Sequence, residues 1–293
     1  MNIIDGKLIA EQIKTEIATE VRKMIDNDIN PPHLAAILVG EDGASQTYVA
    51  SKEKSCKEVG FTSSIYRYPA STSEADLLKA VDFLNEDEEV DGFIVQLPLP
   101  KHISVDKIIE RINPKKDVDG FHPINAGRML AGLPSYLPAT PFGIMQLIER
   151  CNIETEGKNC VVLGRSNIVG TPISILMSRN SKHANATVTI CHSKTQNLKE
   201  ITQKADILIA AIGKPNFVTS DMVKEGAVII DVGIHRTPSA DTKSGFKLCG
   251  DVDFLNVSKK ASYITPVPGG VGLMTIVALL QNTLKAAKKE IYQ

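Results

Sequence analysis

Tyr48 and Lys52 lie four residues apart in a segment with a helical pattern, so their side chains share one face. A lysine acts as a base only when its amine is neutral. Its ordinary pKa of about 10.4 must fall by roughly three units to half-neutralise it near pH 7. Burial produces shifts of this size. The pair is therefore a candidate acid/base site, although ordinary surface pairs have the same spacing.

Polar residues that could complete this site follow later in the first half. Gln96 lies at the carboxyl end of a predicted strand, the edge where parallel sheets bind ligands. Asp117 and Asp119 lie in the loop KKDVDGFHP, for which an Asx-type turn closed by Gly120 is the alternative.

The stretch VVLGRSNIVGTP, residues 161–172, predicts a buried strand, a turn and the start of a helix. Gly164 would allow a tight turn, and Gly170 a close approach of the helix to the sheet. The backbone N–H groups at such a helix start suit a pyrophosphate. Ser166 replaces the middle glycine of the usual G-x-G-x-x-G fingerprint, and Gly170 comes one place late. A tight turn without a ligand is therefore the alternative.

The end of the next predicted strand, ATVTIC (186–191), indicates which dinucleotide would bind. In an NAD site this strand usually ends in a carboxylate that bonds the ribose 2′-hydroxyl. Here His192, Ser193 and Lys194 follow instead. Arg165 of the glycine loop could also grip a 2′-phosphate. The pattern favours NADP, with an ordinary surface turn as the alternative.

A second glycine-rich segment, PVPGGVG (266–272), precedes the last predicted helix. It predicts either a strained turn or a close approach of backbone to a ligand. The sequence contains no H-E-x-x-H, G-x-S-x-G or P-loop motif and no carboxylate-rich metal motif. Kinase, metallohydrolase and serine hydrolase functions therefore have little support, and we expect no bound metal.

The elements that must position these residues alternate along the chain between apolar runs and segments of helical period. This alternation predicts an α/β fold with parallel sheets. In the first half we expect helices over 7–27, 45–59 and 73–85, strands over 34–40, 63–69 and 92–100, a long functional loop over 113–141 and a helix over 141–151. In the second half we expect strands over 159–164, 186–191, 206–212 and 227–232, helices over 170–180, 195–204 and 219–224, and a last helix over 273–289. The second set is typical of a doubly wound nucleotide-binding sheet.

Composition narrows the class of protein. The 293 residues carry 33 Lys and Arg against 34 Asp and Glu, a net charge of −1 that argues against general nucleic-acid or membrane-surface binding. None of the five cysteines forms a C-x-x-C pair, as expected for reduced thiols of a cytoplasmic protein. The longest apolar run, residues 207–212, is too short to span a membrane, and we expect no signal peptide.

Several segments, taken in order, closely resemble the bifunctional methylenetetrahydrofolate dehydrogenase/methenyltetrahydrofolate cyclohydrolase family. They are YVASKEK (48–54), QLPLP (96–100), KDVDGFHPINAGRM (116–129), GRSNIVGTP (164–172), ATVTICHSKT (186–195), DVGIH (231–235), GDVDF (250–254) and PVPGGVG (266–272). The resemblance implies two α/β domains flanking a cleft, the second a Rossmann-like doubly wound parallel sheet. It implies a folate-binding catalytic domain over 1–149, with the helix 273–293 packing back on it, and an NADP-binding domain over 150–272.

The same resemblance implies the reaction. The family oxidises 5,10-methylenetetrahydrofolate to 5,10-methenyltetrahydrofolate with NADP, then hydrolyses the product to 10-formyltetrahydrofolate, in one-carbon metabolism that supplies purine biosynthesis. The family is dimeric, so a homodimer is expected.

By match to the family motifs, Lys52 would be the acid/base residue, tuned by Gln96, with Tyr48 stacking on the substrate and Asp119 holding the pterin. The substrate would contact Tyr48, Lys52, Gln96, Leu97, Asp119, Pro268, Gly269 and Gly270. The cofactor would contact Gly164, Arg165, Ser166, Ile168, Gly170, His192, Ser193 and Ile234.

The sequence departs from the family at two positions. Ala139 stands where the family commonly has cysteine, and Leu273 where it usually has proline. Two other functions compete with the family assignment: an NADP-dependent dehydrogenase of the shikimate dehydrogenase type, and a sensor that binds NADP without turnover. The first does not explain YVASK, QLPLP and PVPGGVG together, and intact Lys52, Gln96 and Asp119 weigh against the second.

Overall fold

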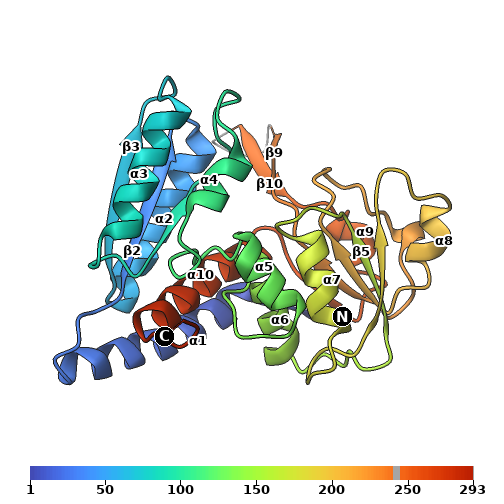
Figure 1. Cartoon of the computed structure of the whole chain (residues 1–293). Coiled ribbons are helices and arrows are strands. Elements are labelled where there is room, and N and C mark those ends of the chain that lie inside the picture. Colours follow the sequence, from blue (N-terminus) through green and yellow to red (C-terminus); the bar gives the residue numbers. More distant parts are fainter. Residues whose placement is uncertain (240–244, 293) are drawn as a thin grey trace. The chain divides into compact units, whose positions relative to one another are not determined.

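The computed structural model describes residues 1–239 and 245–292 and contains two compact units (Figure 1). The six-stranded unit comprises Met1–Glu11 and Thr140–Thr275, and the three-stranded unit comprises Gln12–Ala139 and Ile276–Gln293. Three helices have residues in both units: α1 (Gly6–Asp26), α6 (Ala139–Arg150) and α10 (Val271–Ala287). None of the helices described is at once long and apolar enough to cross a bilayer.

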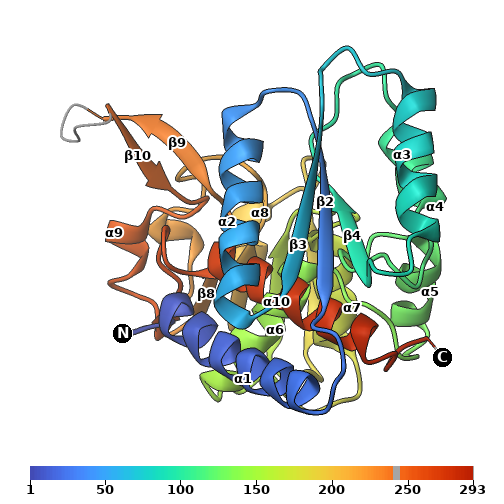
Figure 2. The ribbon, with the colours of Figure 1, turned by 90° about the vertical axis from the view of Figure 1, so that its left-hand side faces the viewer.

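The three-stranded unit is built on a parallel sheet with the strand order β3-β2-β4. Its strands are β2 (His33–Val39), β3 (Thr62–Tyr68) and β4 (Gly92–Val95), and its other helices are α2 (Gly43–Val59), α3 (Glu74–Glu86), α4 (Val105–Arg111) and α5 (Pro123–Leu130). Helix α2 covers one face of the sheet, while α3 and α4 cover the other (Figure 2). The central strand β2 precedes both neighbours in sequence, so the strand order reverses between β2 and β4. Ligands bind at the carboxyl edge of such reversals.

The central strand β2 is buried on both of its faces from Leu34 to Val39. Ala35, Ile37 and Val39 of β2 face α3, where Leu77 and Val81 lie one helical turn apart, and all five are buried. Each large apolar side chain buried in this way contributes roughly 1.5–3 kcal/mol. Two of the helices begin at a side-chain cap. At the start of α2, the Asp42 carboxylate accepts a hydrogen bond from the Ser45 N–H. At the start of α3, the Ser73 hydroxyl accepts one from the Asp76 N–H.

The six-stranded unit contains an all-parallel sheet with the order β1-β11-β8-β7-β5-β6. Its strands are β1 (Asn2–Ile3), β5 (Asn159–Leu163), β6 (Thr187–Cys191), β7 (Ile207–Ala210), β8 (Val228–Asp231) and β11 (Tyr263–Ile264). Its short helices are α7 (Gly170–Ser178), α8 (Leu198–Thr202), η1 (Ser220–Met222) and α9 (Phe254–Val257). A separate antiparallel pair joins β9 (His235–Pro238) to β10 (Phe246–Cys249).

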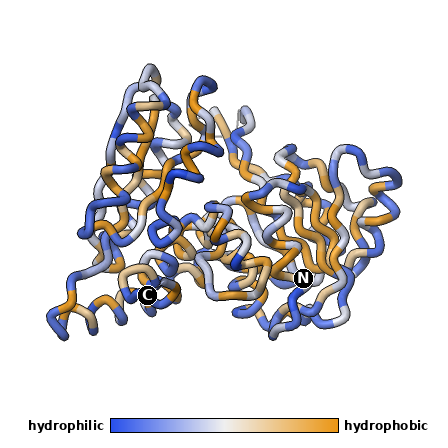
Figure 3. The backbone as a smooth tube through the Cα atoms, in the orientation of Figure 1, coloured by the Kyte–Doolittle hydropathy of each residue, from blue (hydrophilic) through white to orange (hydrophobic). Residues whose placement is uncertain are grey.

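Burial of the central strands explains why their sequences are continuous apolar runs. Strands β7 and β8 are buried along their whole length, as expected for parallel strands covered on both faces. Figure 3 shows the hydrophobic residues of this sheet in orange. The chain order reverses between β5 and β7, because β6 pairs on one side of β5 and β7 on the other. The predicted fold class, α/β with two parallel sheets, is confirmed.

Two sequence-based predictions were wrong in detail. The strand predicted over 92–100 ends at Val95, because the following QLPLP segment contains two prolines without an N–H to donate. The loop predicted over 113–141 contains helix α5, which begins with the N-cap His122 and with Pro123. Its apolar Ile124 and Leu130 are 51% and 68% exposed, so the segment lacks the pattern of a core helix. The division at 149/150 and 272/273 by binding role stays a prediction.

Candidate functional site

Lys52 and Gln96 form a direct hydrogen bond in the three-stranded unit. Lys52 lies in the middle of α2, and its Nζ donates to Oε1 of Gln96 at 3.1 Å. Gln96 is the first residue after β4, and its own N–H still donates to the Ile37 carbonyl at 2.9 Å. Both side chains are half-buried at the carboxyl edge of the sheet. Two residues separated by 44 positions are thus brought together, as the family resemblance implies.

The orientation of the Gln96 amide is fixed by a second bond. Its Nε2 donates to the backbone carbonyl of Leu97 at 2.7 Å, which turns Oε1 toward Lys52. An amide oxygen accepts a hydrogen bond from an ammonium and from a neutral amine alike. Gln96 therefore positions the amine without adding a negative charge.

The electrostatic setting of Lys52 favours its neutral form. Burial lowers the pKa of Lys52, and the nearby charge of Asp119 partly opposes this shift. Burial likewise raises the pKa of Asp119, with Lys52 opposing. Tyr48, one turn earlier on α2, is half-buried and its phenol pKa is also raised by burial. The arrangement is that of an amine able to exchange a proton beside a carboxyl.

The Asp119 turn is held by backbone packing and by a buried carboxyl. A Cβ added to Gly120, whose φ is +72°, would lie 2.6 Å from the carbonyl carbon of Leu137. Asp117, which is 1% exposed, accepts from the N–H of Phe121 at 3.1 Å and of His122 at 2.8 Å. The Asx-type turn is therefore present. It anchors Asp117, while Asp119 is left to interact with Lys52.

Residues that the sequence reasoning missed brace the same turn from other elements. Asn282 of α10 is fully buried, and its Nδ2 donates to the carbonyls of Val118 and Leu137, both at 2.8 Å. Asn125 of α5 donates to Asp117 at 2.9 Å and accepts from the Tyr292 hydroxyl at 2.7 Å. These contacts span long sequence distances, so no local pattern announces them.

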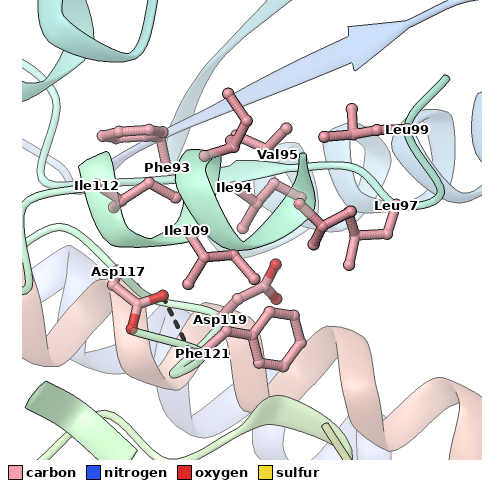
Figure 4. A pocket seen from close by; sticks show the side chains of 12 residues that line it. Phe93, Ile94, Val95, Leu97, Leu99, Ile109, Ile112, Asp117, Asp119 and Phe121 are labelled. Atoms are coloured by element: carbon pink, nitrogen blue, oxygen red, sulfur yellow. Dashed lines mark hydrogen bonds between the residues drawn. The ribbon is translucent and has the colours of Figure 1, made fainter. Parts of the chain in front are cut away.

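A narrow apolar pocket opens beside Asp119. Figure 4 shows Asp117 and Asp119 below α4, with Asp117 bonded back to Phe121. The apolar lining comes from β4, the segment after it, α4 and Phe121: Phe93, Ile94, Val95, Leu97, Leu99, Val105, Ile108, Ile109, Ile112 and Phe121. Leu97 and Asp119, both predicted substrate contacts, thus share one pocket.

Asp117 gives the folded protein a definite pH dependence. Burial raises its pKa from 3.8 to about 7, although the donors around it oppose the shift. Folding therefore favours the protonated form. This contribution, on the order of 4 kcal/mol, is complete below the unfolded pKa and is lost as the pH rises through about 7. Burial raises the pKa of Asp231 to about 6, which acts in the same direction.

We expect the free energy of unfolding to fall between about pH 5 and pH 7, measured by urea titration. The Asp117→Asn variant should show a shallower fall, because the titrating carboxyl is gone. Equal pH slopes in the two proteins would contradict this assignment.

In the six-stranded unit, the glycine loop lies at the reversal between β5 and β7. A Cβ on Gly164, whose φ is +122°, would lie 2.3 Å from the Ala211 carbonyl oxygen. A Cβ on Gly170 would lie 2.2 Å from the Gly164 carbonyl oxygen. The N–H groups of Val169 and Gly170 donate to the exposed Ser166 hydroxyl, at 3.2 and 3.4 Å. This loop fits a dinucleotide phosphate, which could take those donors at the start of α7.

The other predicted cofactor residues lie on the carboxyl edge of the same sheet. Arg165 and Ser193 are exposed, as a contact to a phosphate requires. The His192 N–H donates to Thr195 at 2.8 Å, so the segment after β6 is also an ordered turn. Two apolar residues, Ile168 and Ile234, are 41% and 46% exposed without an apolar cover. This edge of the sheet therefore carries a cation and a hydroxyl that suit a phosphate, together with apolar side chains that suit the rings of a nucleotide.

The segment before α10 is a tight turn in the six-stranded unit. Gly269 has φ +107°, and a Cβ on Gly270 would lie 2.6 Å from the Pro266 carbonyl oxygen. The backbone at Gly6 approaches so closely that a Cβ there would lie 2.3 Å from the Gly270 oxygen. The Val267–Pro268 peptide bond just before Gly269 is cis. Packing alone accounts for these glycines, so the contacts predicted for Pro268, Gly269 and Gly270 with substrate stay predictions.

Two family models match the chain. One, described as the catalytic domain of tetrahydrofolate dehydrogenase/cyclohydrolase, matches residues 4–119. The other, described as the NAD(P)-binding domain of the same enzyme, matches residues 138–291. The chain belongs to the tetrahydrofolate dehydrogenase/cyclohydrolase family. The predicted family is thereby confirmed, and the alternative of a shikimate dehydrogenase type is set aside.

Relatives of this tetrahydrofolate dehydrogenase/cyclohydrolase cover its full length. The bifunctional protein FolD of Bacteroides fragilis is 61% identical over 293 residues, all of both chains. The crystal structure of FolD from Campylobacter jejuni has a TM-score of 0.92 at 48% identity and covers 99% of each chain. The Trypanosoma brucei enzyme, complexed with NADP and an inhibitor, has a TM-score of 0.93 at 36% identity, over 99% of this chain and 98% of that one.

Proposed function

We propose that the chain oxidises 5,10-methylenetetrahydrofolate with NADP and hydrolyses the resulting 5,10-methenyltetrahydrofolate to 10-formyltetrahydrofolate. The observation that carries this proposal is the half-buried amine of Lys52, bonded to the neutral Gln96 and close to Asp119. A lysine in this setting suits proton transfer near neutral pH. The family assignment supports both activities.

In the hydrolytic step, Lys52 acts first as a general base and then as a general acid. As water attacks the methenyl carbon, a C–O bond forms and the neutral amine accepts a proton from the water. When the bond from that carbon to N5 breaks, the ammonium returns the proton to N5, the hydroxyl gives up its remaining proton to water as the C=O bond forms, and 10-formyltetrahydrofolate results. Gln96 holds the amine in place during both transfers. Tyr48 stacks on the substrate rings, and Asp119 bonds the polar edge of the pterin.

NADP, when bound, supplies the hydride acceptor for the oxidation. Gly164, Ser166 and Gly170 would hold its pyrophosphate at the start of α7. Arg165 and Ser193 would bind its 2′-phosphate, because both are exposed and neither neighbours a carboxylate in sequence. Ile168 and Ile234 offer apolar contacts, with His192 between the strand end and Ser193.

The first assay supplies methylenetetrahydrofolate with NADP or with NAD and follows reduced nicotinamide and methenyltetrahydrofolate separately. Reduced NADP should form while methenyltetrahydrofolate stays low, and the enzyme should speed the hydrolysis of methenyltetrahydrofolate supplied alone. Folded protein that reduces neither coenzyme would overturn the dehydrogenase proposal and favour a sensor without turnover.

Replacing Arg165 with glutamine should raise the KM for NADP by about 10–100-fold, because a charge-assisted hydrogen bond is worth roughly 1.5–3 kcal/mol. The KM for NAD should change little, since NAD has no 2′-phosphate. Steady-state kinetics with both coenzymes measure this. Arg22→Gln, on the exposed face of α1, is the matched control. Equal changes for the two coenzymes would remove Arg165 from the 2′-phosphate site.

We further infer a cytoplasmic homodimer. Among the described residues no strand pairs with the outer edge of β6, where Ile190 is 40% exposed. Pairing with a second copy would cover this edge, which sheet proteins otherwise protect. All five cysteines are free, as in a reducing compartment. Light scattering on the purified protein gives the mass, and a monomer at micromolar concentration would contradict the dimer.

A further inference from the structure

One buried carboxylate holds the loop that follows β7. The Asp251 side chain is fully buried, and its Oδ2 accepts from the N–H groups of Ile212 at 2.7 Å and Gly213 at 3.0 Å. Its Oδ1 accepts from the N–H of Lys214 at 2.9 Å. Three successive backbone donors thus converge on one anion. Such bonds to a charged acceptor are stronger than neutral ones, so the loop is held firmly.

The same carboxylate also holds the loop that follows β8. His235 donates from Nε2 to Oδ1 of Asp251 at 2.7 Å, since a carboxylate can only accept. Gly233 passes so close that an added Cβ would lie 2.4 Å from that oxygen. Ile234, which stands between these two residues, is a proposed cofactor contact. Asp251 and His235 therefore join the loops after two neighbouring strands.

Asp251 is itself fixed by Asp231 at the end of β8. Asp231 accepts from the N–H groups of Asp251 at 2.9 Å, Val252 at 3.0 Å and Gly233 at 3.0 Å. The Asp251 carbonyl in turn accepts from the Val218 N–H at 2.9 Å. Its position is thus determined by backbone contacts on both sides and does not depend on a ligand.

Asp231, His235 and Asp251, here called the carboxylate cluster, hold loops at the same edge of the sheet that fits the dinucleotide. Strands β5, β7 and β8 are parallel, so the loops after them meet at one edge. The Ala211 carbonyl, at the start of the loop that Asp251 holds, is in contact with Gly164 of the glycine loop. Both oxygens of Asp251 are already taken by donors of the protein. The cluster therefore shapes the site and does not contact the ligand.

We propose that Asp251 and His235 are positioning residues that set the affinity for the dinucleotide. This inference rests on the proposed function. It extends that function to residues that would not touch the cofactor. Loops already held in the binding conformation lose less conformational freedom when the ligand binds. If the loops after β7 and β8 were no longer joined, they would bind NADP more weakly. The chemistry at Lys52 lies in the other unit and uses no residue of this cluster.

The test measures NADP binding directly. His235→Phe keeps a flat ring but removes the donor. By isothermal titration, it should raise the Kd for NADP about tenfold, the loss expected for one charge-assisted bond. Hydrolysis of methenyltetrahydrofolate, measured without NADP, should be unchanged. His235→Gln should restore most of the affinity, because its amide can donate to Asp251.

The matched control is His183→Phe. His183 also lies near a carboxylate, with its Nε2 3.9 Å from Glu149, but it precedes β6 at the amino edge of the sheet. Its Kd for NADP should equal that of the wild type. If His235→Phe does not fold, His235→Ala is measured in its place.

Three results would overturn the inference: an unchanged Kd in the folded His235 variant, a failure of His235→Gln to recover affinity, or an equal loss of the hydrolytic activity. A wild-type protein that does not bind NADP is a different outcome, because it overturns the proposed function itself.

Discussion

Replacing Lys52 with methionine is expected to lower the rate of methenyltetrahydrofolate hydrolysis by about 10²–10⁴-fold, the usual contribution of a general acid/base. Methionine keeps the length of the side chain and its contacts with α2 but has no proton to exchange. The variant loses the hydrogen bond from Lys52 to Gln96. Folding should be little affected, because that bond lies at the half-buried carboxyl edge of the sheet, outside the apolar core. Loss of methenyltetrahydrofolate absorbance, corrected for the spontaneous reaction, measures the effect.

Lys57→Met is the matched control for this experiment. Lys57 lies on the same helix, is exposed and pairs with Glu53 at 2.8 Å. Such a surface pair contributes only about 0–1 kcal/mol, so both activity and stability should stay near wild type. Full hydrolytic activity in Lys52→Met would show that another group transfers the proton.

The second large effect is expected for Gly170→Ala. The new methyl group would lie 2.2 Å from the Gly164 carbonyl oxygen and 2.5 Å from its carbon, so α7 must move away from β5. Overpacking of this kind costs on the order of 3 kcal/mol. The backbone N–H groups at the displaced start of α7 would also no longer point toward a bound phosphate. We expect a lower urea midpoint together with a large increase in the Kd for NADP.

Gly127→Ala separates this effect from the general effect of a glycine replacement. Gly127 lies inside α5 with no atom near the added Cβ, so alanine should stabilise the protein by up to about 1 kcal/mol. Its NADP affinity should be unchanged. Wild-type affinity in Gly170→Ala would show that the helix start does not bind the pyrophosphate.

The parts of the fold that could be predicted from the sequence depend on local signals. Strands such as β7 read as apolar runs because both faces are buried, and α3 begins at a serine that caps it. The Lys52–Gln96 pair was expected from the family resemblance alone, and the structure explains it, because parallel topology brings the carboxyl end of β4 next to the helix that follows β2.

What could not be predicted depends on contacts between distant segments. Strands β1 and β11 have two residues each, too few for a period to show. Asn282 contacts Val118 across 164 positions, and His235 reaches Asp251 only because two loops share a sheet edge. The segments DVGIH and GDVDF carry family resemblance, but nothing in their spacing assigns them a mutual hydrogen bond.

The bracing of the Asp119 turn by α10 has a consequence for biosynthesis. A ribosome delivers the chain from its N-terminus, and segments fold as their partners emerge. Val118 and Leu137 are synthesised long before Asn282, so their carbonyls cannot accept its hydrogen bonds until α10 has emerged. In the other unit, β1 waits in the same way for β11. A nascent chain therefore carries Lys52 and Gln96 early, but the Val118 and Leu137 carbonyls at the Asp119 turn gain their Asn282 donor only near the end of synthesis.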